Sequence, residues 1–135
     1  MRAKESRLRK PVMSFLRGLG CENLCLEISF VDREIDVFGL RMAPSFRSYA
    51  VELKIENWQK ALKQAAIYQL CADYCYVAMP DNKAKSLQLR DFRDAGVGVL
   101  GVDLKSKQVV VYSEAQPSSV KRTPYSNYLA RAARL

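Results

Sequence analysis

The stretch Tyr49-Ala-Val-Glu-Leu-Lys-Ile55 decides how the rest of the chain is interpreted. Its apolar side chains alternate with polar ones, which is the pattern of a β-strand with one face turned to a core. Glu52 and Lys54 therefore lie side by side on one face of that strand, with an apolar face behind them. A carboxylate and an ammonium group are thus held two residues apart on a rigid element.

A second alternating stretch, Arg33-Glu-Ile-Asp-Val-Phe-Gly39, lies just upstream, and Asp36 there points away from its apolar neighbours. If the two strands pair as neighbours, Asp36 converges with Glu52 and Lys54 at one end of a sheet. Two carboxylates beside a lysine form a donor set for a divalent metal that acts on a phosphodiester.

The order of these residues carries a resemblance. Asp36, then Glu52-Leu53-Lys54, then a helix with Gln64-Ala-Ala-Ile-Tyr68 resembles the PD-(D/E)xK nuclease superfamily, which includes restriction endonucleases, archaeal Holliday junction resolvases and DNA-repair nucleases. The resemblance covers roughly residues 5–112 by order of elements. An isolated E-x-K triplet carries little information, so its context is what counts. The proline of the family's name is absent, with Ile35 before Asp36, as in many members.

The resemblance implies a metal site. Asp36 and Glu52 would hold Mg²⁺ or Mn²⁺ with the backbone carbonyl of Leu53, and Glu27 or Glu5 would be an auxiliary ligand. The other reading of Glu27, an exposed strand glutamate, is slightly favoured.

The resemblance also assigns roles to the neighbours of that metal. Lys54 would orient or help deprotonate the attacking water and stabilise the charge of the transition state. Gln64 would position Lys54, the substrate phosphate or a water, and Tyr68 would support Gln64. As a bare amphipathic helix, the stripe of Lys60, Gln64 and Tyr68 would instead face solvent.

The implied function is a metal-dependent endonuclease that hydrolyses DNA, duplex or branched, in repair or recombination, and that leaves a 5′-phosphate. The expected nucleic-acid contacts are Arg7, Arg9, Lys10, Arg33, Lys60, Tyr68, Lys121 and Arg122. A homodimer is left open, because one subunit of this size that cuts both strands of a duplex would usually need a partner.

Composition favours an anionic partner and excludes several classes of enzyme. The 135 residues include 22 Lys and Arg against 14 acids, a net charge of +8, and no histidine. A basic excess of this size favours nucleic acid, although charge alone does not separate DNA, RNA and acidic protein. The lack of histidine excludes Ser-His-Asp and Cys-His hydrolases and histidine-ligated zinc. No membrane span or signal peptide is evident, so we expect an intracellular protein.

The expected fold class is α/β, a restriction endonuclease-like αβββαβ core with a central mixed sheet flanked by helices. By residue number, we expect a first helix that either starts at Pro11 or begins in residues 1–10 and is kinked there, and that ends by 19. We then expect strands 24–30, 34–40 and 47–55 as an antiparallel meander, a helix 58–72, a parallel strand 74–79, a helix 84–94, and strands 97–104 and 108–112. Residues 1–115 would form the nuclease-like domain, and 116–135 a basic-aromatic extension of that domain.

Some details of these elements matter later. In strand 24–30, alternation puts Leu26, Ile28 and Phe30 on one side, and Glu27 on the other, where it could approach Asp36. In helix 58–72, which Asn57 caps, Trp58 belongs to the packing face.

The four cysteines are expected to be structural. Cys21-x-x-x-Cys25 and Cys71-x-x-x-Cys75 do not have the C-x₂-C spacing of a zinc knuckle, and Cys25 and Cys75 fall in apolar strand patterns. An iron–sulfur site, which some nucleases of the superfamily have, or a disulfide is the alternative.

Two other functions compete with the nuclease. One is a catalytically inactive nucleic-acid-binding module, or a subunit of a nuclease complex, with the same fold. The other is a structural α/β protein whose Glu52–Lys54 pair is only a surface ion pair, worth about 0–1 kcal/mol.

Overall fold

A computed structural model describes residues 3–134 of the chain. In chain order its elements are α1 (Ala3–Ser6), α2 (Arg9–Gly18), β1 (Asn23–Phe30), β2 (Arg33–Arg41), β3 (Arg47–Leu53), α3 (Trp58–Tyr68), β4 (Tyr74–Pro80), α4 (Asp81–Ala84), α5 (Arg90–Ala95), β5 (Gly98–Val102), β6 (Val109–Ser113) and α6 (Thr123–Arg134). The fold is α/β, as expected.

The strands form one mixed sheet in the order β1-β2-β3-β4-β5-β6. β1, β2 and β3 make the expected antiparallel meander. β4 runs parallel to β3, and β5 runs parallel to β4, because α3 and the α4–α5 segment carry the chain back across the sheet. β6 returns antiparallel to β5 as an edge hairpin. The antiparallel meander, the parallel strand after it and the edge hairpin therefore follow the prediction.

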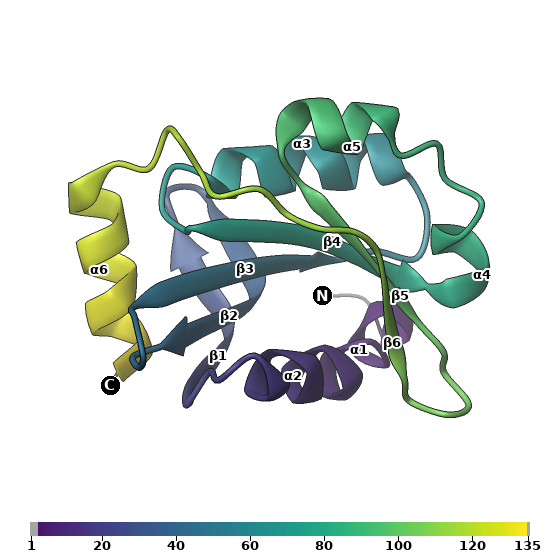
Figure 1. The fold of residues 1–135 in the computed structure, drawn as a ribbon, viewed down its shortest axis with the longest axis horizontal. Coiled ribbons are helices and arrows are strands. Elements are labelled where there is room, and N and C mark those ends of the chain that lie inside the picture. The colour runs from purple at the N-terminus through teal and green to yellow at the C-terminus, as the bar shows by residue number, and fades with distance from the viewer. Residues whose placement is uncertain (1–2, 135) are drawn as a thin grey trace.

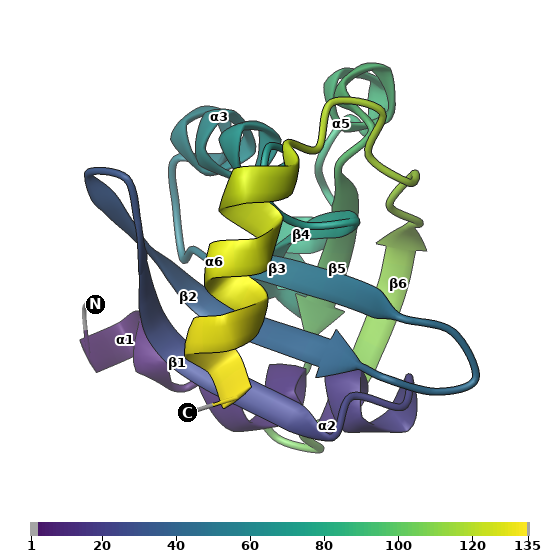
Figure 2. The same cartoon turned by 90° about the vertical axis from the view of Figure 1, so that its left-hand side faces the viewer.

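Helices cover both faces of the sheet (Figure 1). α1 and α2 lie against one face, α3 and α5 lie against the other, and α6 crosses that second face over β1 and β2 (Figure 2). β4 and β5 are buried along almost their whole length, as strands covered on both faces must be. No helix within residues 3–134 has the length and apolar character needed to cross a membrane.

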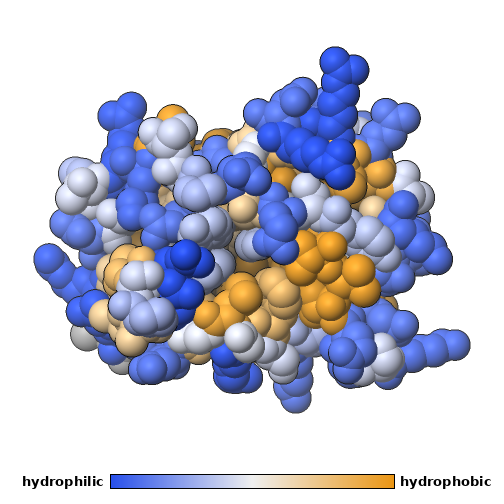
Figure 3. Space-filling model, viewed as in Figure 1, coloured by the Kyte–Doolittle hydropathy of each residue, from blue (hydrophilic) through white to orange (hydrophobic). Residues whose placement is uncertain are grey.

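Three apolar clusters fill these layers. The first joins α2 to the sheet through Leu8, Val12 and Leu16. The second lies under α6 and includes Phe30 and Leu129. The third lies under α3 and α5. On the face seen in Figure 3, hydrophilic side chains dominate, with an apolar patch over β6, which is an edge strand of the sheet.

Two helices differ from the prediction. α3 ends at Tyr68 rather than at 72, because the chain tightens there into turns in which Gln69 and Leu70 N–H groups donate three residues back. The expected helix 84–94 is instead two short helices, α4 and α5. Ser86 and Leu87 N–H groups make similar tight turns between them. Local turn bonding outweighs the helical period in both places.

The face assignments of β1 and β2 are each wrong at one point. In β2, Ile35 packs in the cluster under α6 and Val37 in the cluster under α2, so these two residues do not share a face opposite Asp36 as expected. In β1, Leu26 packs with the cluster under α2, whereas Ile28 and Phe30 belong to the cluster under α6. Glu27 between them has φ of 52°, and it is skipped in the ladder opposite Asp36. A left-handed residue reverses the alternation of side chains, so the strand exchanges its faces there.

Candidate metal and nucleic-acid site

The candidate site lies where β2 and β3 part. Their ladder ends at the pair Val37–Val51. Beyond it, the Asp36 side chain takes the place of the next backbone acceptor, and Asp36 Oδ2 accepts a hydrogen bond of 2.8 Å from Leu53 N. Asp36 is thereby held against the backbone of the Glu52-Leu53-Lys54 segment. The predicted convergence of these residues is what the structure shows.

Tyr68 is tied into this gap from α3. Its hydroxyl lies 2.7 Å from Glu52 Oε1 and 3.0 Å from the carbonyl oxygen of Glu34. The hydroxyl has one hydrogen, so it donates to Glu52 when that carboxylate is ionised. When Glu52 is protonated, it donates to the Tyr68 oxygen, and Tyr68 donates to Glu34.

Tyr68 is fully buried, which corrects two expectations. It cannot contact nucleic acid, because none of its surface is exposed. Nor does it lie on a solvent-facing stripe of α3. Tyr68 was expected to support Gln64. In the structure its hydroxyl group holds Glu52 instead.

The pKa values of Asp36 and Glu52 are both raised above their ordinary values. Burial, and then the charge of Asp36, raises the pKa of Glu52 from 4.5 to about 8. Burial also raises the pKa of Asp36, against the opposing effect of the Leu53 N–H bond. Lys54 acts in the other direction and lowers the pKa of Glu52. A pair of desolvated carboxylates close together is stabilised by any added positive charge.

The two candidate auxiliary ligands, Glu5 and Glu27, lie in different surroundings. Glu5 of α1 is buried, and its charge raises the pKa of Asp36, so it lies near the pair. Glu27 is exposed, and its Oε1 pairs with Arg9 at 2.8 Å. The expectation that Glu27 approaches Asp36 across the hairpin is therefore wrong, because its left-handed backbone turns it toward α2.

Gln64 lies one helical turn before Tyr68 on the same side of α3. Its Oε1 is buried and has no hydrogen-bond partner among the described residues. A buried amide oxygen of this kind needs a donor, which a water, a lysine ammonium group or a ligand could supply.

The donor set fits a metal that keeps much of its own water. Within residues 3–134 no three Asp, Glu or Cys side chains are arranged to hold a metal ion. Asp36 and Glu52 are two carboxylates, which is the number that Mg²⁺ commonly uses when water and phosphate oxygens complete its shell. The residues thus fit Mg²⁺ better than a metal that needs an all-protein cage.

Basic side chains gather beside the site at the start of α2. Arg7, Arg9 and Lys10 line a cleft of about 510 Å³. Lys107, from the β5–β6 turn, lines it as well, although it was not among the predicted nucleic-acid contacts. No sequence signal could have found it, because 97 positions separate Lys10 from Lys107 and only the sheet order brings them together. Arg33 lies close enough to Tyr68 to lower its pKa.

The other predicted contacts are divided between the two ends of the sheet. Lys60 is exposed in the first turn of α3, at the end where β3 finishes. Lys121 pairs with Asp73 at 2.5 Å, and Asp73 in turn binds the N–H of Ser48. Since Ser48 is four residues from Glu52, Lys121 and the neighbouring Arg122 lie about 13 Å along the strand from the site. They do not join Arg9 and Lys10.

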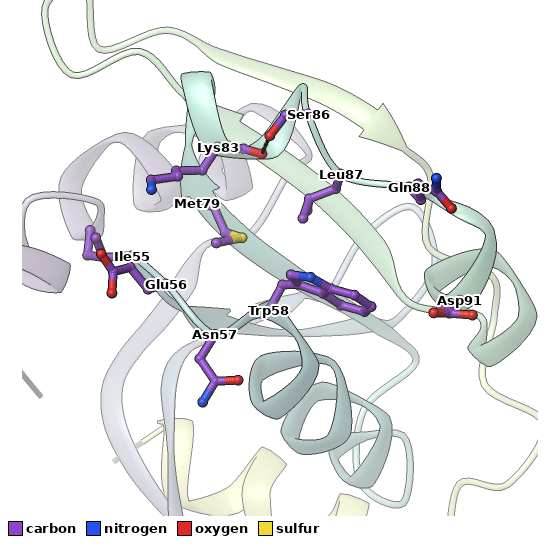
Figure 4. A pocket seen from close by; sticks show the side chains of 10 residues that line it. All are labelled: Ile55, Glu56, Asn57, Trp58, Met79, Lys83, Ser86, Leu87, Gln88 and Asp91. Atoms are coloured by element: carbon purple, nitrogen blue, oxygen red, sulfur yellow. Dashed lines mark hydrogen bonds between the residues drawn. The ribbon is translucent and has the colours of Figure 1, made fainter.

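A hollow of about 510 Å³ adjoins the site on its other side (Figure 4). It begins at Ile55, the residue after Lys54, and Trp58 and Met79 lie within it. The helical pattern predicted only a packing role for Trp58. A lone tryptophan just after the E-x-K strand was the available signal.

All four cysteines are free thiols, and three of them are buried. Burial raises the pKa of Cys21 to about 11 and that of Cys71 to about 12. These thiols behave as small apolar residues, and no disulfide joins them.

Comparisons with known proteins bear on the fold alone. No protein-family model matches the sequence, and no curated protein matches it. Among solved structures, the chain is similar to the SPO1766 protein of unknown function from Silicibacter pomeroyi, with a TM-score of 0.72 and 19% sequence identity. The alignment covers 96% of this chain and 82% of that one.

Proposed function

We propose that this protein is a metal-dependent nuclease of the PD-(D/E)xK kind, with a restriction endonuclease-like core, that hydrolyses DNA. The observation that supports it best is the meeting of Asp36 and Glu52 where β2 and β3 part. Glu52 is buried, Asp36 is half-buried, and each raises the electrostatic cost of ionising the other, so the pair is suited to bind a divalent cation.

The residues would divide the chemistry as follows. Asp36 and Glu52, with the Leu53 carbonyl, would hold Mg²⁺ or Mn²⁺, which when bound supplies positive charge to the phosphate and lowers the pKa of water. Lys54 orients the attacking water and offsets negative charge as it develops on the phosphate. Tyr68 holds Glu52 in place through its hydroxyl group. The unpartnered Gln64 oxygen is an acceptor for the Lys54 ammonium group or for a water.

Charge supports DNA as the substrate. The net charge is +8, and four cations line the cleft at the start of α2. Arg9 and Lys10 belong to α2, Arg7 precedes it and Lys107 belongs to the β5–β6 turn, and Arg9 pairs with Glu27 of β1. Cations so placed would neutralise phosphates of a strand that enters the site. Duplex or branched DNA in repair or recombination, cut to leave a 5′-phosphate, is the substrate class we propose.

The test is cleavage of supercoiled plasmid and of branched DNA with Mg²⁺ or Mn²⁺. We would compare the wild type with Asp36→Asn, Glu52→Gln and Lys54→Met, because the first two keep the acceptors for Leu53 N and Tyr68. We expect each to lose cleavage by about 100-fold or more. Glu22→Gln, an exposed carboxylate before β1, is the matched control and should cleave as the wild type does.

The outcomes separate the alternatives. Cleavage that persists equally in all variants would come from a contaminating nuclease and would contradict the proposal. DNA binding without cleavage in the wild type would favour the inactive binding module instead. The specific support for the inactive module is the burial of Glu52, which is only 5% exposed and so offers little surface to a metal ion.

A further inference from the structure

The hollow beside Lys54 lies at the carboxyl ends of two parallel strands. Ile55 leaves β3, and Met79 lies at the end of β4, which pairs in parallel with β3. The carboxyl ends of parallel strands are where α/β sheets bind ligands. Because Ile55 directly follows Lys54, a group bound in the hollow would lie close to Lys54 and Glu52.

The floor of the hollow is flat and apolar. Figure 4 shows the Trp58 indole lying across it, with the side chains of Met79 and Leu87 directed toward the ring. Phe92 packs against Trp58 with ring centroids 5.6 Å apart, which fixes the indole in its position. Trp58 and Leu87 remain partly exposed. A half-exposed, immobilised aromatic face is a stacking surface for a planar ring.

The rim of the hollow is polar and more acidic than basic. The lining contains two carboxylates, those of Glu56 and Asp91, and one cation, Lys83. The amide residues Asn57 and Gln88 also belong to it. Carboxylates accept hydrogen bonds from amino groups, such as those on cytosine and adenine. They repel phosphate. The hollow therefore suits an uncharged planar ring with amino groups, and not the phosphate backbone.

We propose that this hollow binds an unpaired, amino-bearing nucleobase of the DNA substrate, stacked on Trp58. This inference rests on the proposed function and narrows its substrate. A base inside a duplex has neighbours on both faces, so only a base out of the stack can enter. The preferred substrate is then a strand with an unpaired base next to the cut, as at a bulge, a branch point or a single-stranded end.

The chain's single tryptophan provides the measurement, because Trp58 fluorescence reports on this hollow alone. The full chain is titrated in metal-free buffer with short single strands of cytidine, of thymidine, and of cytidine with abasic positions. We expect the cytidine strand to quench Trp58 and to bind about 5- to 150-fold more tightly than the abasic strand. The thymidine strand should bind less tightly than the cytidine strand.

Variants then test the rim. Glu56→Gln with Asp91→Asn should reduce the preference for cytidine over thymidine, whereas the control Asp94→Asn, exposed on α5 and outside the lining, should keep it. Both changes are on the surface, so the fold is preserved. Trp58→Ala removes the stacking face but also its contact with Phe92, so the abasic comparison carries the test if that variant unfolds.

The outcomes distinguish this inference from the nuclease proposal. Equal affinity for base-containing and abasic strands, with unchanged Trp58 fluorescence, overturns the inference whether or not DNA is cut. Base-dependent quenching without any cleavage by the wild type overturns the nuclease and leaves a base-binding module. Base-dependent quenching together with faster cleavage of bulged than of fully paired duplex supports both.

Discussion

In the candidate site, the ionised form of Glu52 is strongly disfavoured. Its carboxylate is 5% exposed, lies near Asp36, and has a neutral hydrogen-bond donor in Tyr68. Lys54 offsets only part of that cost, since the pKa of Glu52 stays raised to about 8. A buried carboxylate with a second carboxylate beside it costs stability, and the metal ion that we propose would offset this cost.

Stability should therefore fall as the pH rises. The pKa of Glu52 is 4.5 in its ordinary state and about 8 when folded, so the folded protein binds that proton more tightly than the unfolded chain does. The stabilisation is complete below pH 4.5 and is lost as the pH approaches 8. Glu52→Gln, which mimics the protonated form, should flatten this dependence in denaturant titrations. A wild-type curve that rises over this range would contradict the assignment.

Magnesium should reverse the effect at pH 8. A ligand that binds only the folded state at 100 times its dissociation constant stabilises that state by about 2.7 kcal/mol. We expect Mg²⁺ to raise the melting temperature of the wild type and to leave Asp36→Asn and Glu52→Gln unchanged. The same shift in all three proteins would mean that the ion binds elsewhere.

Among the elements, the β5–β6 turn shows how the fold places a cation. Asp103 Oδ1 accepts hydrogen bonds from Lys105 N and Ser106 N, which lowers the pKa of Asp103, and Lys107 N donates to Asp103 O. Lys107 then takes a left-handed conformation, with φ of 64°. The turn is thus preformed, and it aims Lys107 at the cleft by α2.

Loss of this cation should be visible in the salt dependence of DNA binding. Asn tolerates the left-handed conformation, so Lys107→Asn removes the charge without straining the turn. We expect weaker binding, and a slope of log K against log salt that is smaller by about one. Lys105→Asn is the matched control, since Lys105 lines a different hollow. Equal slopes in the two variants would exclude Lys107 from the DNA interface.

At the scale of the whole molecule, the C-terminal segment covers one face of the sheet. Ser118 Oγ donates to Gln69 O, and Lys121 pairs with Asp73, so the segment is fastened before α6 begins. Leu129 of α6 is fully buried in the cluster that contains Phe30. The prediction that residues 116–135 extend the main domain remains a prediction, and cooperative unfolding tests it.

We expect Leu129→Ala to destabilise the whole protein by about 2–4 kcal/mol, because it leaves a cavity against the sheet. Tyr128 is 57% exposed, so Tyr128→Ala should change the free energy of unfolding by less than about 0.5 kcal/mol. Circular dichroism and Trp58 fluorescence should report one transition for each protein. If α6 melted separately from the rest, residues 116–135 would not belong to the same cooperative unit.

The sequence alone predicted the antiparallel meander, the parallel strand that follows it and the meeting of Asp36 with the Glu52-Leu53-Lys54 segment. These follow from local rules, since alternation with a period of two and short connections leave few arrangements. Only the tertiary structure decided the rest. A single left-handed residue, Glu27, exchanged the faces of β1 and turned that carboxylate to Arg9.

The same holds for the groups that surround the carboxylate pair. Tyr68 is buried because α3 lies directly above the gap between β2 and β3, and Lys107 reaches α2 because the sheet brings a distant turn beside it. Periodicity predicts which way a side chain points from its own element only where the backbone of that element is regular. It does not fix what stands opposite, because that depends on how elements far apart in the chain pack against each other.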